Sequence, residues 1–208
     1  MRKRILITGA SSGLGRGMAR EFARAGSDLA LCARRLDRLE SLKAELEAAH
    51  PAIRVSIHSL DVTDHEQVFA VFAAARDALG GLDRVIVNAG IGQGAPVGKG
   101  QFALNRSIVE TNFLAALAQC EAAVEIFRML RKPSIKISTI YPGYIRTEMN
   151  DGAPAKQTPF IIDEATGCRL LVRAIEKEKA KAYVPWWPWA PLGWLMKRLP
   201  LAWVAKLN

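Results

Sequence analysis

The chain has 208 residues, of which 50% are hydrophobic, and this size suits one domain around a single buried core. Lys and Arg number 29 against 20 Asp and Glu, a formal net charge of +9 that favours anionic partners such as coenzyme phosphates or an acidic membrane surface. Basic residues stand beside acidic ones along the expected helices, so a solvated helical face explains most of the charge. We therefore expect no nucleic-acid partner.

Signals for export, disulfides and metals are lacking. Met1–Arg4 leads directly into a short apolar run and a glycine-rich turn, which leaves no stretch long enough for a signal peptide or membrane span. We therefore expect a cytoplasmic protein. The three cysteines, Cys32, Cys120 and Cys168, are scattered, which suits buried reduced thiols rather than a disulfide framework. The histidines lack metal-ligand spacing and fit helix boundaries or strands, so we expect no metal.

Short apolar runs alternate with helical periodicity along most of the chain, the pattern of a parallel sheet wrapped by helices. The expected strands are 4–8, 28–33, 54–60, 84–88, 135–140 and 182–184. The expected helices are 14–25, 36–49, 64–79, 109–128 and 163–179. The pattern predicts a single-domain α/β fold with a doubly wound parallel sheet over residues 1–185, followed by a tryptophan-rich tail at 186–208.

A glycine-rich segment joins the first expected strand to the first helix. Glycines at 9, 13 and 15 permit a tight turn, close approach of the backbone to a pyrophosphate, and close packing of helix on strand. The N–H groups at the helix start would face the phosphates. An ordinary glycine-rich turn is the alternative, but the strand before it and the helix after it favour a Rossmann-type dinucleotide site. Its expected residues are Gly9, Ser11, Ser12, Gly13, Leu14 and Gly15.

The end of the second expected strand carries two cations, Arg34 and Arg35. A site for NAD prefers a carboxylate here, which accepts hydrogen bonds from the ribose hydroxyls, whereas a 2′-phosphate needs cations. A guanidinium binds phosphate through two parallel donors, and Ser11 or Ser12 adds a hydroxyl. The alternative is that both arginines begin a solvated helix, where Asp37 could pair with one. The sequence favours NADP(H).

The spacing Gly-x-x-x-Gly-x-Gly resembles that of the short-chain dehydrogenase/reductase family, and further matches follow in the family's order. They are Asp61-Val62, Asn88-Ala89-Gly90, Asn112, Pro142-Gly143 and Thr147. The resemblance implies that the first pair contacts adenine, and that the next triplet, with Pro142, Gly143 and Thr147, lines the inner coenzyme cleft. For Asn112 it implies a catalytic role in a proton relay through water. It also implies an oxidoreductase interconverting a small-molecule carbonyl and alcohol, and a homodimer or homotetramer.

The family's catalytic Tyr-x-x-x-Lys pair is missing. Four residues after the three tyrosines stand Ile145, Glu148 and Trp187. Family members carry about 50 residues with the catalytic serine, tyrosine and lysine after the asparagine helix, whereas this chain passes almost at once to the next strand. Loss of an interior strand and helix would expose apolar surface at about 25 cal/mol per Å². Either the natural protein has a further segment near Arg128 to Met129, or the deletion is real and leaves a coenzyme-binding pseudoenzyme or scaffold.

All five tryptophans follow the last expected strand. They are Trp186, Trp187, Trp189, Trp194 and Trp203. One interpretation is a lid over the substrate or an oligomer contact, because the family's C-terminal part usually closes the pocket. The other is peripheral membrane contact, since aromatic and cationic side chains suit the headgroup region. Prolines break any long amphipathic helix here, and both interpretations suggest an apolar substrate or surface.

Overall fold

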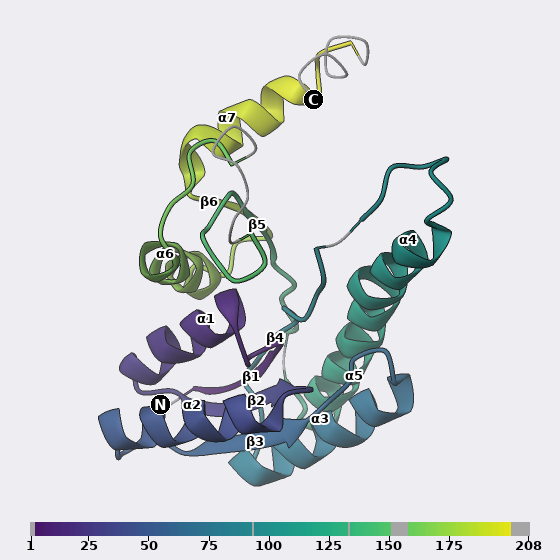
Figure 1. Cartoon of the computed structure of the whole chain (residues 1–208). Helices are drawn as coiled ribbons and strands as arrows, with labels where there is room; N and C mark the ends of the chain where they lie inside the picture. The colour runs from purple at the N-terminus through teal and green to yellow at the C-terminus, as the bar shows by residue number, and fades with distance from the viewer. Residues whose placement is uncertain (1–2, 93, 133, 151–157, 201–208) are drawn as a thin grey trace. The chain divides into compact units, whose positions relative to one another are not determined.

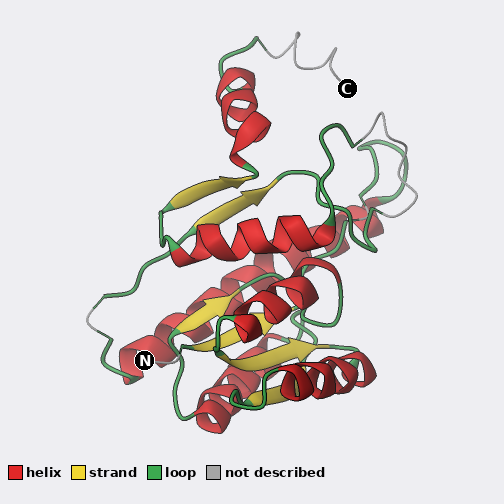
Figure 2. Cartoon of the chain, turned by 90° about the vertical axis from the view of Figure 1, so that its left-hand side faces the viewer, coloured by secondary structure: helices red, strands yellow, loops and turns green. Residues whose placement is uncertain are grey.

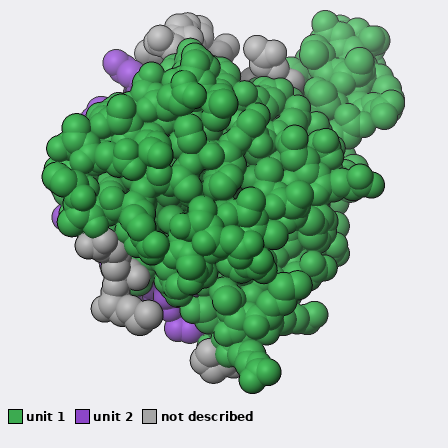
Figure 3. All heavy atoms as spheres, turned by 90° about the horizontal axis from the view of Figure 1, so that it is seen from below, with its two compact units in different colours: residues 1–135, 147–149 green, residues 136–146, 150–208 purple. Residues whose placement is uncertain are grey.

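The computed structural model describes residues 3–92, 94–132, 134–150 and 158–200 (Figure 1). Two compact units make up the chain (Figure 3). The first comprises residues 1–135 with 147–149, and the second 136–146 with 150–208.

The first unit is built on a four-stranded parallel sheet. Its strands are β1 Arg4–Thr8, β2 Asp28–Ala33, β3 Val55–Ser59 and β4 Arg84–Ile86, in the order β3-β2-β1-β4. Ile5 to Thr8 and all of β2 are buried, because these apolar strands are covered on both faces. The order places the β1–α1 turn beside the ends of β2 and β4, where a parallel sheet of this type binds ligands.

Helices flank this sheet (Figure 2). They are α1 Gly13–Arg24, α2 Leu36–Ala49, α3 His65–Leu79, α4 Phe102–Val109 and α5 Ala115–Met129, with a π-helical turn, η1 Glu110–Leu114, between the last two. α1 and α2 pack on each other and on β2, whereas α3 packs on β1 to β3 and on α5. Leu6, Phe72 and Ile126 belong to the core shared by β1, α3 and α5. The predicted α/β fold class is confirmed.

Two elements of the first unit differ from expectation. The helix expected from 109 begins at Phe102 and contains the π-helical turn. The strand expected over 84–88 ends at Ile86, because the Asn88 N–H donates to the Thr8 hydroxyl instead of continuing the ladder. Among the described residues β4 pairs with β1 alone, so it is an edge strand.

The second unit carries its own two-stranded parallel sheet. It consists of β5 Thr139–Pro142 and β6 Lys181–Val184, with α6 Glu164–Glu176 and α7 Trp186–Met196. The Tyr141 and Tyr183 rings stack across the strands at 5.1 Å between centroids. β5, at Thr139–Pro142, begins and ends later than the strand that the sequence predicted over 135–140. Prolines do not prevent a helix in the tail, because the backbone departs from helical geometry at Trp187, before Pro188.

None of the three cysteines, all of them among the described residues, forms a disulfide, but their burial corrects one expectation. Cys32 and Cys168 are buried, whereas Cys120 is exposed on α5. Burial raises the pKa of the Cys32 thiol to about 12. The histidines lie where expected, at the end of α2, on β3 and at the start of α3. No helix within the described residues is long and apolar enough to span a membrane.

Candidate coenzyme site

A cavity of about 280 Å³ opens at the carboxyl ends of the first unit's strands. Its walls come from the β1–α1 turn and from the segments that follow β2, β3 and β4. The lining residues that the sequence predicted are Gly9, Ser11, Ser12, Gly13, Leu14, Arg34, Arg35, Asp61, Val62, Asn88, Ala89, Gly90 and Thr147. Residues separated by up to 138 positions in the sequence therefore meet at one edge of the sheet.

The glycine turn has the geometry that the spacing predicted. Gly9 has a φ of +66°, in the left-handed region that favours glycine. A Cβ at Gly15 would overlap the Gly9 carbonyl oxygen, so Gly15 lets the first turn of α1 approach the turn closely. Gly15 itself is buried and, unlike the other predicted residues of the turn, is not a wall residue of the cavity. The amino end of α1 begins at Gly13, where helix N–H groups lack partners within the helix and suit an anion.

The segment after β3 is held by its own hydrogen bonds. The Asp61 carboxylate accepts from the Thr63 N–H at 3.0 Å and from the Thr63 hydroxyl at 2.7 Å. Burial opposes ionisation of Asp61, but the Thr63 hydrogen bonds and the nearby Arg34 charge lower its pKa overall. Asp61 is thus an ionised acceptor, and the buried Val62 lies beside it. This arrangement suits the polar edge and apolar face of an adenine ring.

Arg35 lies directly over the glycine turn. Its Nη2 donates to Ser12 Oγ at 2.7 Å and to Ser11 Oγ at 3.2 Å. The side chain is 45% exposed, so the cation keeps access to solvent and to a ligand. A guanidinium with two adjacent hydroxyl groups is a donor set that fits a phosphate.

Asn112 lies in the π-helical turn and is exposed. Its Oδ1 accepts the Ile91 N–H at 2.9 Å, and its Nδ2 donates to the Ile91 carbonyl at 2.8 Å. Both ends of the amide therefore fix the segment that leaves Gly90. π-Helical turns are frequent at functional sites, and this one aims Asn112 at the cavity wall.

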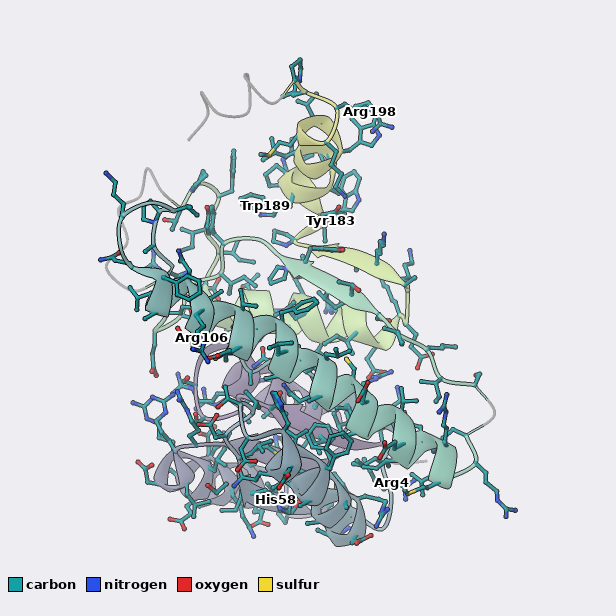
Figure 4. The ribbon with its side chains drawn as sticks, turned by 90° about the vertical axis from the view of Figure 1, so that its right-hand side faces the viewer. Arg4, His58, Arg106, Tyr183, Trp189 and Arg198 are labelled. Atoms are coloured by element: carbon teal, nitrogen blue, oxygen red, sulfur yellow. The ribbon has the colours of Figure 1, made fainter. Side chains whose placement is uncertain are left out.

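Pro142 and Gly143 belong to the second unit, at and after the end of β5. A Cβ at Gly143 would overlap the Trp189 indole, which packs against the Gly143 backbone. Trp189 belongs to α7 and is labelled in Figure 4. Trp189 also meets Tyr144 edge to face at 5.3 Å. This part of the tryptophan-rich tail is therefore packed into its own unit, whereas Trp186, Trp187 and Trp194 are more than half exposed.

Sequence reasoning missed several lining residues. They are Ala33, Leu60, Thr63, Ile91, Thr111, Glu148 and Met149. Most adjoin a predicted residue, so a wider window around each motif finds them. Glu148 gave no signal of its own, because nothing in the sequence brings it to the arginines after β2. Among the described residues, no cluster of three or more His, Cys, Asp or Glu side chains could hold a metal ion.

The model of the short chain dehydrogenase family matches residues 3–132. The chain belongs to this family. An uncharacterized oxidoreductase of Mycobacterium tuberculosis is 45% identical over 242 aligned positions, which cover 96% of this chain and 94% of that protein. An uncharacterized oxidoreductase of Myxococcus xanthus is 28% identical over 222 positions, covering 87% of each chain.

Solved structures of short-chain dehydrogenases share the fold. An alcohol dehydrogenase of Thermococcus sibiricus superimposes with a TM-score of 0.76 at 22% identity, covering 88% of this chain and 96% of that chain. A short-chain dehydrogenase of Sphingobium yanoikuyae gives 0.76 at 21% identity, covering 96% and 97%. The Rossmann-type architecture predicted from the sequence is therefore shown by both comparisons.

Both oxidoreductase alignments contain positions that this chain lacks. The mycobacterial alignment has 242 positions and includes 96% of the 208 residues of this chain, which is about 200 residues. About 42 positions of the alignment therefore have no counterpart in this chain. The Myxococcus alignment leaves about 41 of its 222 positions without one, since 87% of this chain is about 181 residues. The family model ends at residue 132, next to the place where the sequence predicts the missing segment.

Proposed function

We propose that this protein is an NADP(H)-dependent oxidoreductase that interconverts a carbonyl and an alcohol on an apolar small molecule. The observation that carries the coenzyme assignment is Arg35, which lies over the glycine turn with the Ser11 and Ser12 hydroxyl groups. A 2′-phosphate at this position would offer the guanidinium an ionised acceptor in place of the neutral serine hydroxyl groups, and hydrogen bonds between two ionised groups are among the strongest in proteins.

The cavity fits the remaining parts of a dinucleotide. The turn from Gly9 to Gly15 would hold the pyrophosphate against the amino end of α1, and Asp61 with Val62 would hold the adenine. Asn88-Ala89-Gly90 and Thr147 would line the inner cleft. Pro142 and Gly143 belong to the other unit, and their contact with a coenzyme stays a prediction. Bound NADPH would supply a hydride to the substrate carbon. Asn112 would orient the Ile91 segment and take part in proton transfer through water.

Structural relatives support this coenzyme assignment. The Sphingobium yanoikuyae enzyme was solved in complex with NADPH, and the Thermococcus sibiricus enzyme in complex with 5-hydroxy-NADP. Both share the fold of this chain, with a TM-score of 0.76 each. The basic pair Arg34-Arg35 at the end of β2 is the feature of this chain that agrees with those ligands.

Proton donation is the step for which this chain lacks the family's residues. None of the described cavity residues is a tyrosine or lysine. We place the absent segment, about 42 positions long, next to β4, which is an edge strand here, and next to α5, where Leu117 and Met129 are exposed. A protein with that segment would be a complete reductase. Under the alternative hypothesis the deletion is real, and the protein without this segment would be a coenzyme-binding pseudoenzyme or scaffold.

Restoring the segment tests the proposal. The 208-residue chain and a chimera carrying the mycobacterial segment between Arg128 and Met129 are compared for NADPH binding by fluorescence and for NADPH oxidation with apolar ketones and aldehydes. We expect both to bind NADPH and only the chimera to turn over. Failure of either protein to bind NADPH would contradict the coenzyme assignment, and a bound but inactive chimera would favour the scaffold alternative. The intact mass of the native protein shows which form the cell makes.

We further propose that α7 serves as a lid or an oligomer contact in a cytoplasmic homo-oligomer. The packing of Trp189 on Gly143 supports a structural role, while exposed Trp186, Trp187 and Trp194 leave an apolar surface for a partner. Peripheral membrane contact is the competing proposal, supported by Arg198, which stacks on the Trp194 ring at 3.9 Å. Sedimentation with anionic liposomes, with and without residues 186–208, separates them. Equal pelleting of both forms would exclude the membrane role.

A further inference from the structure

One carboxylate enters the arginine cluster around the glycine turn. Glu148, which follows Thr147 and belongs to the first unit, is a wall residue of the cavity. It accepts two hydrogen bonds from Arg38 Nη1, at 2.9 Å and 3.2 Å. Its carboxylate oxygens also lie 3.7 Å from Arg16 and 3.9 Å from Arg35. Three guanidinium groups from two helices and the segment between them therefore share this one acid.

Of these three cations, Arg35 is the one that the proposed function assigns to the 2′-phosphate. Arg35 reaches Ser11 and Ser12 with Nη2 while its Nη1 faces Glu148. The acid is thus a neighbour of the same guanidinium that would bind the phosphate. All four charged side chains are 30% to 48% exposed, so these ion pairs exchange readily with a competing anion in water.

We propose that Glu148 is a specificity-determining residue, an internal counter-ion that occupies the arginine cluster and competes with the 2′-phosphate of the coenzyme. The inference rests on the proposed NADP(H) site. Binding of the phosphate breaks the contacts of Glu148 with Arg35 and Arg38, and any carboxylate charge that stays nearby repels the phosphate. Glu148 thereby lowers the affinity for 2′-phosphorylated ligands and leaves ligands with a free 2′-hydroxyl unaffected.

The test uses Glu148→Gln, which keeps the shape of the side chain and removes its charge. Adenosine 2′,5′-bisphosphate and 5′-AMP are titrated by calorimetry, because they differ only in the 2′-phosphate and need no catalytic segment. We expect the variant to bind the bisphosphate about three- to fivefold more tightly, toward the upper end of what exposed ion pairs allow, and 5′-AMP within about twofold of the wild type. The affinity of the variant for the bisphosphate should also fall more steeply with salt.

A matched control is Glu45→Gln. Glu45 lies on α2, is 47% exposed and pairs with Arg20 through both carboxylate oxygens, but it is not a wall residue of the cavity. This variant should leave both affinities unchanged. Unchanged or weaker bisphosphate binding by Glu148→Gln would overturn the inference.

The parallel variant Arg35→Ala tests the underlying site. If Arg35→Ala loses the preference for the bisphosphate while Glu148→Gln changes nothing, the NADP(H) assignment stands and the role of Glu148 fails. If the wild type shows no preference for the bisphosphate over 5′-AMP, both fail.

Discussion

The Asn88 side chain donates from Nδ2 to the Thr8 carbonyl oxygen at 3.0 Å, and the Thr8 hydroxyl accepts the Asn88 N–H at 3.1 Å. The same hydroxyl accepts the Ala89 N–H at 3.2 Å and faces the Ile86 carbonyl at 3.4 Å. Thr8 and Asn88 thus join the ends of β1 and β4 without a ladder. The coenzyme-side loops of both strands are fixed by this reciprocal contact.

Replacing Thr8 with Val should loosen this junction. Thr8 is fully buried, so two backbone N–H groups would lose their acceptor where water does not reach. We expect a loss of about 1–3 kcal/mol in the free energy of unfolding, measured in urea, and weaker NADPH binding. Thr8→Ser keeps the hydroxyl and should retain most of both. Equal losses in the two variants would mean that the methyl group, not the hydroxyl, holds the junction.

The first half of the fold follows from the sequence because its determinants are local. β1 and β2 are apolar runs bounded by turn residues, and α3 ends at Gly80 in the left-handed conformation, as its glycine predicted. The early end of β4 was not predictable, because Val87 continues the apolar run and only a contact 80 residues away, from Asn88 to Thr8, ends the ladder. Long-range pairs of this kind leave no periodic pattern in the sequence.

The candidate site, like the fold, was predictable where its determinants are local in the sequence and unpredictable where they are long-range contacts. The glycine turn and Arg35 were predicted from local patterns in two successive βα units, and both line the cavity. Glu148 is missing from that prediction because its partner Arg38 is 110 residues away and neither residue belongs to a motif. The separate β5–β6 sheet was likewise unforeseen, since its strands have the same composition as those of the main sheet.

Arg35→Ala should lower the affinity for NADP⁺ much more than the affinity for NAD⁺. Loss of a guanidinium that binds a phosphate removes charge-assisted hydrogen bonds, and we expect the affinity for NADP⁺ to fall about tenfold to a hundredfold. NAD⁺ has no 2′-phosphate, so its affinity should stay nearly constant. Arg35→Lys keeps the charge without the planar fork and should give an intermediate loss. An equal loss of affinity for both coenzymes, measured by calorimetry, would show that Arg35 stabilises the glycine turn and does not bind the 2′-phosphate.

Asp83 should make the first unit sensitive to acid. Its carboxylate accepts from Arg4 Nε at 2.9 Å and from Lys132 Nζ at 2.8 Å, which joins the starts of β1 and β4 to the segment that follows α5. The Arg4 hydrogen bond, with that of Lys132, lowers the pKa of Asp83 well below its usual value.

Because this pKa is lower in the folded chain than the value of about 3.9 in an unfolded one, the stabilisation is present above about pH 4. It is lost as the pH falls toward the folded pKa. Asp83→Asn should therefore lower the melting temperature at pH 7 and flatten its decline below pH 4. A variant whose melting temperature falls with acid as steeply as that of the wild type would show that other carboxylates govern acid unfolding.

Gly143→Ala tests how α7 is held. The added methyl group would overlap the Trp189 indole, whose Nε1 is buried and finds no hydrogen-bond partner among the described residues, so packing is the contact that positions the ring there. We expect Trp189 to leave its place against Tyr144, with a red shift of tryptophan fluorescence and faster proteolysis within residues 186–200. Gly193→Ala is the matched control, since a Cβ there meets Tyr183 only at an ordinary 3.4 Å. If both variants keep the wild-type spectrum, the indole has room to shift and α7 is not anchored through Gly143. If Gly143→Ala alone changes it, the small residue at 143 is explained by tail packing, independently of any contact with a coenzyme.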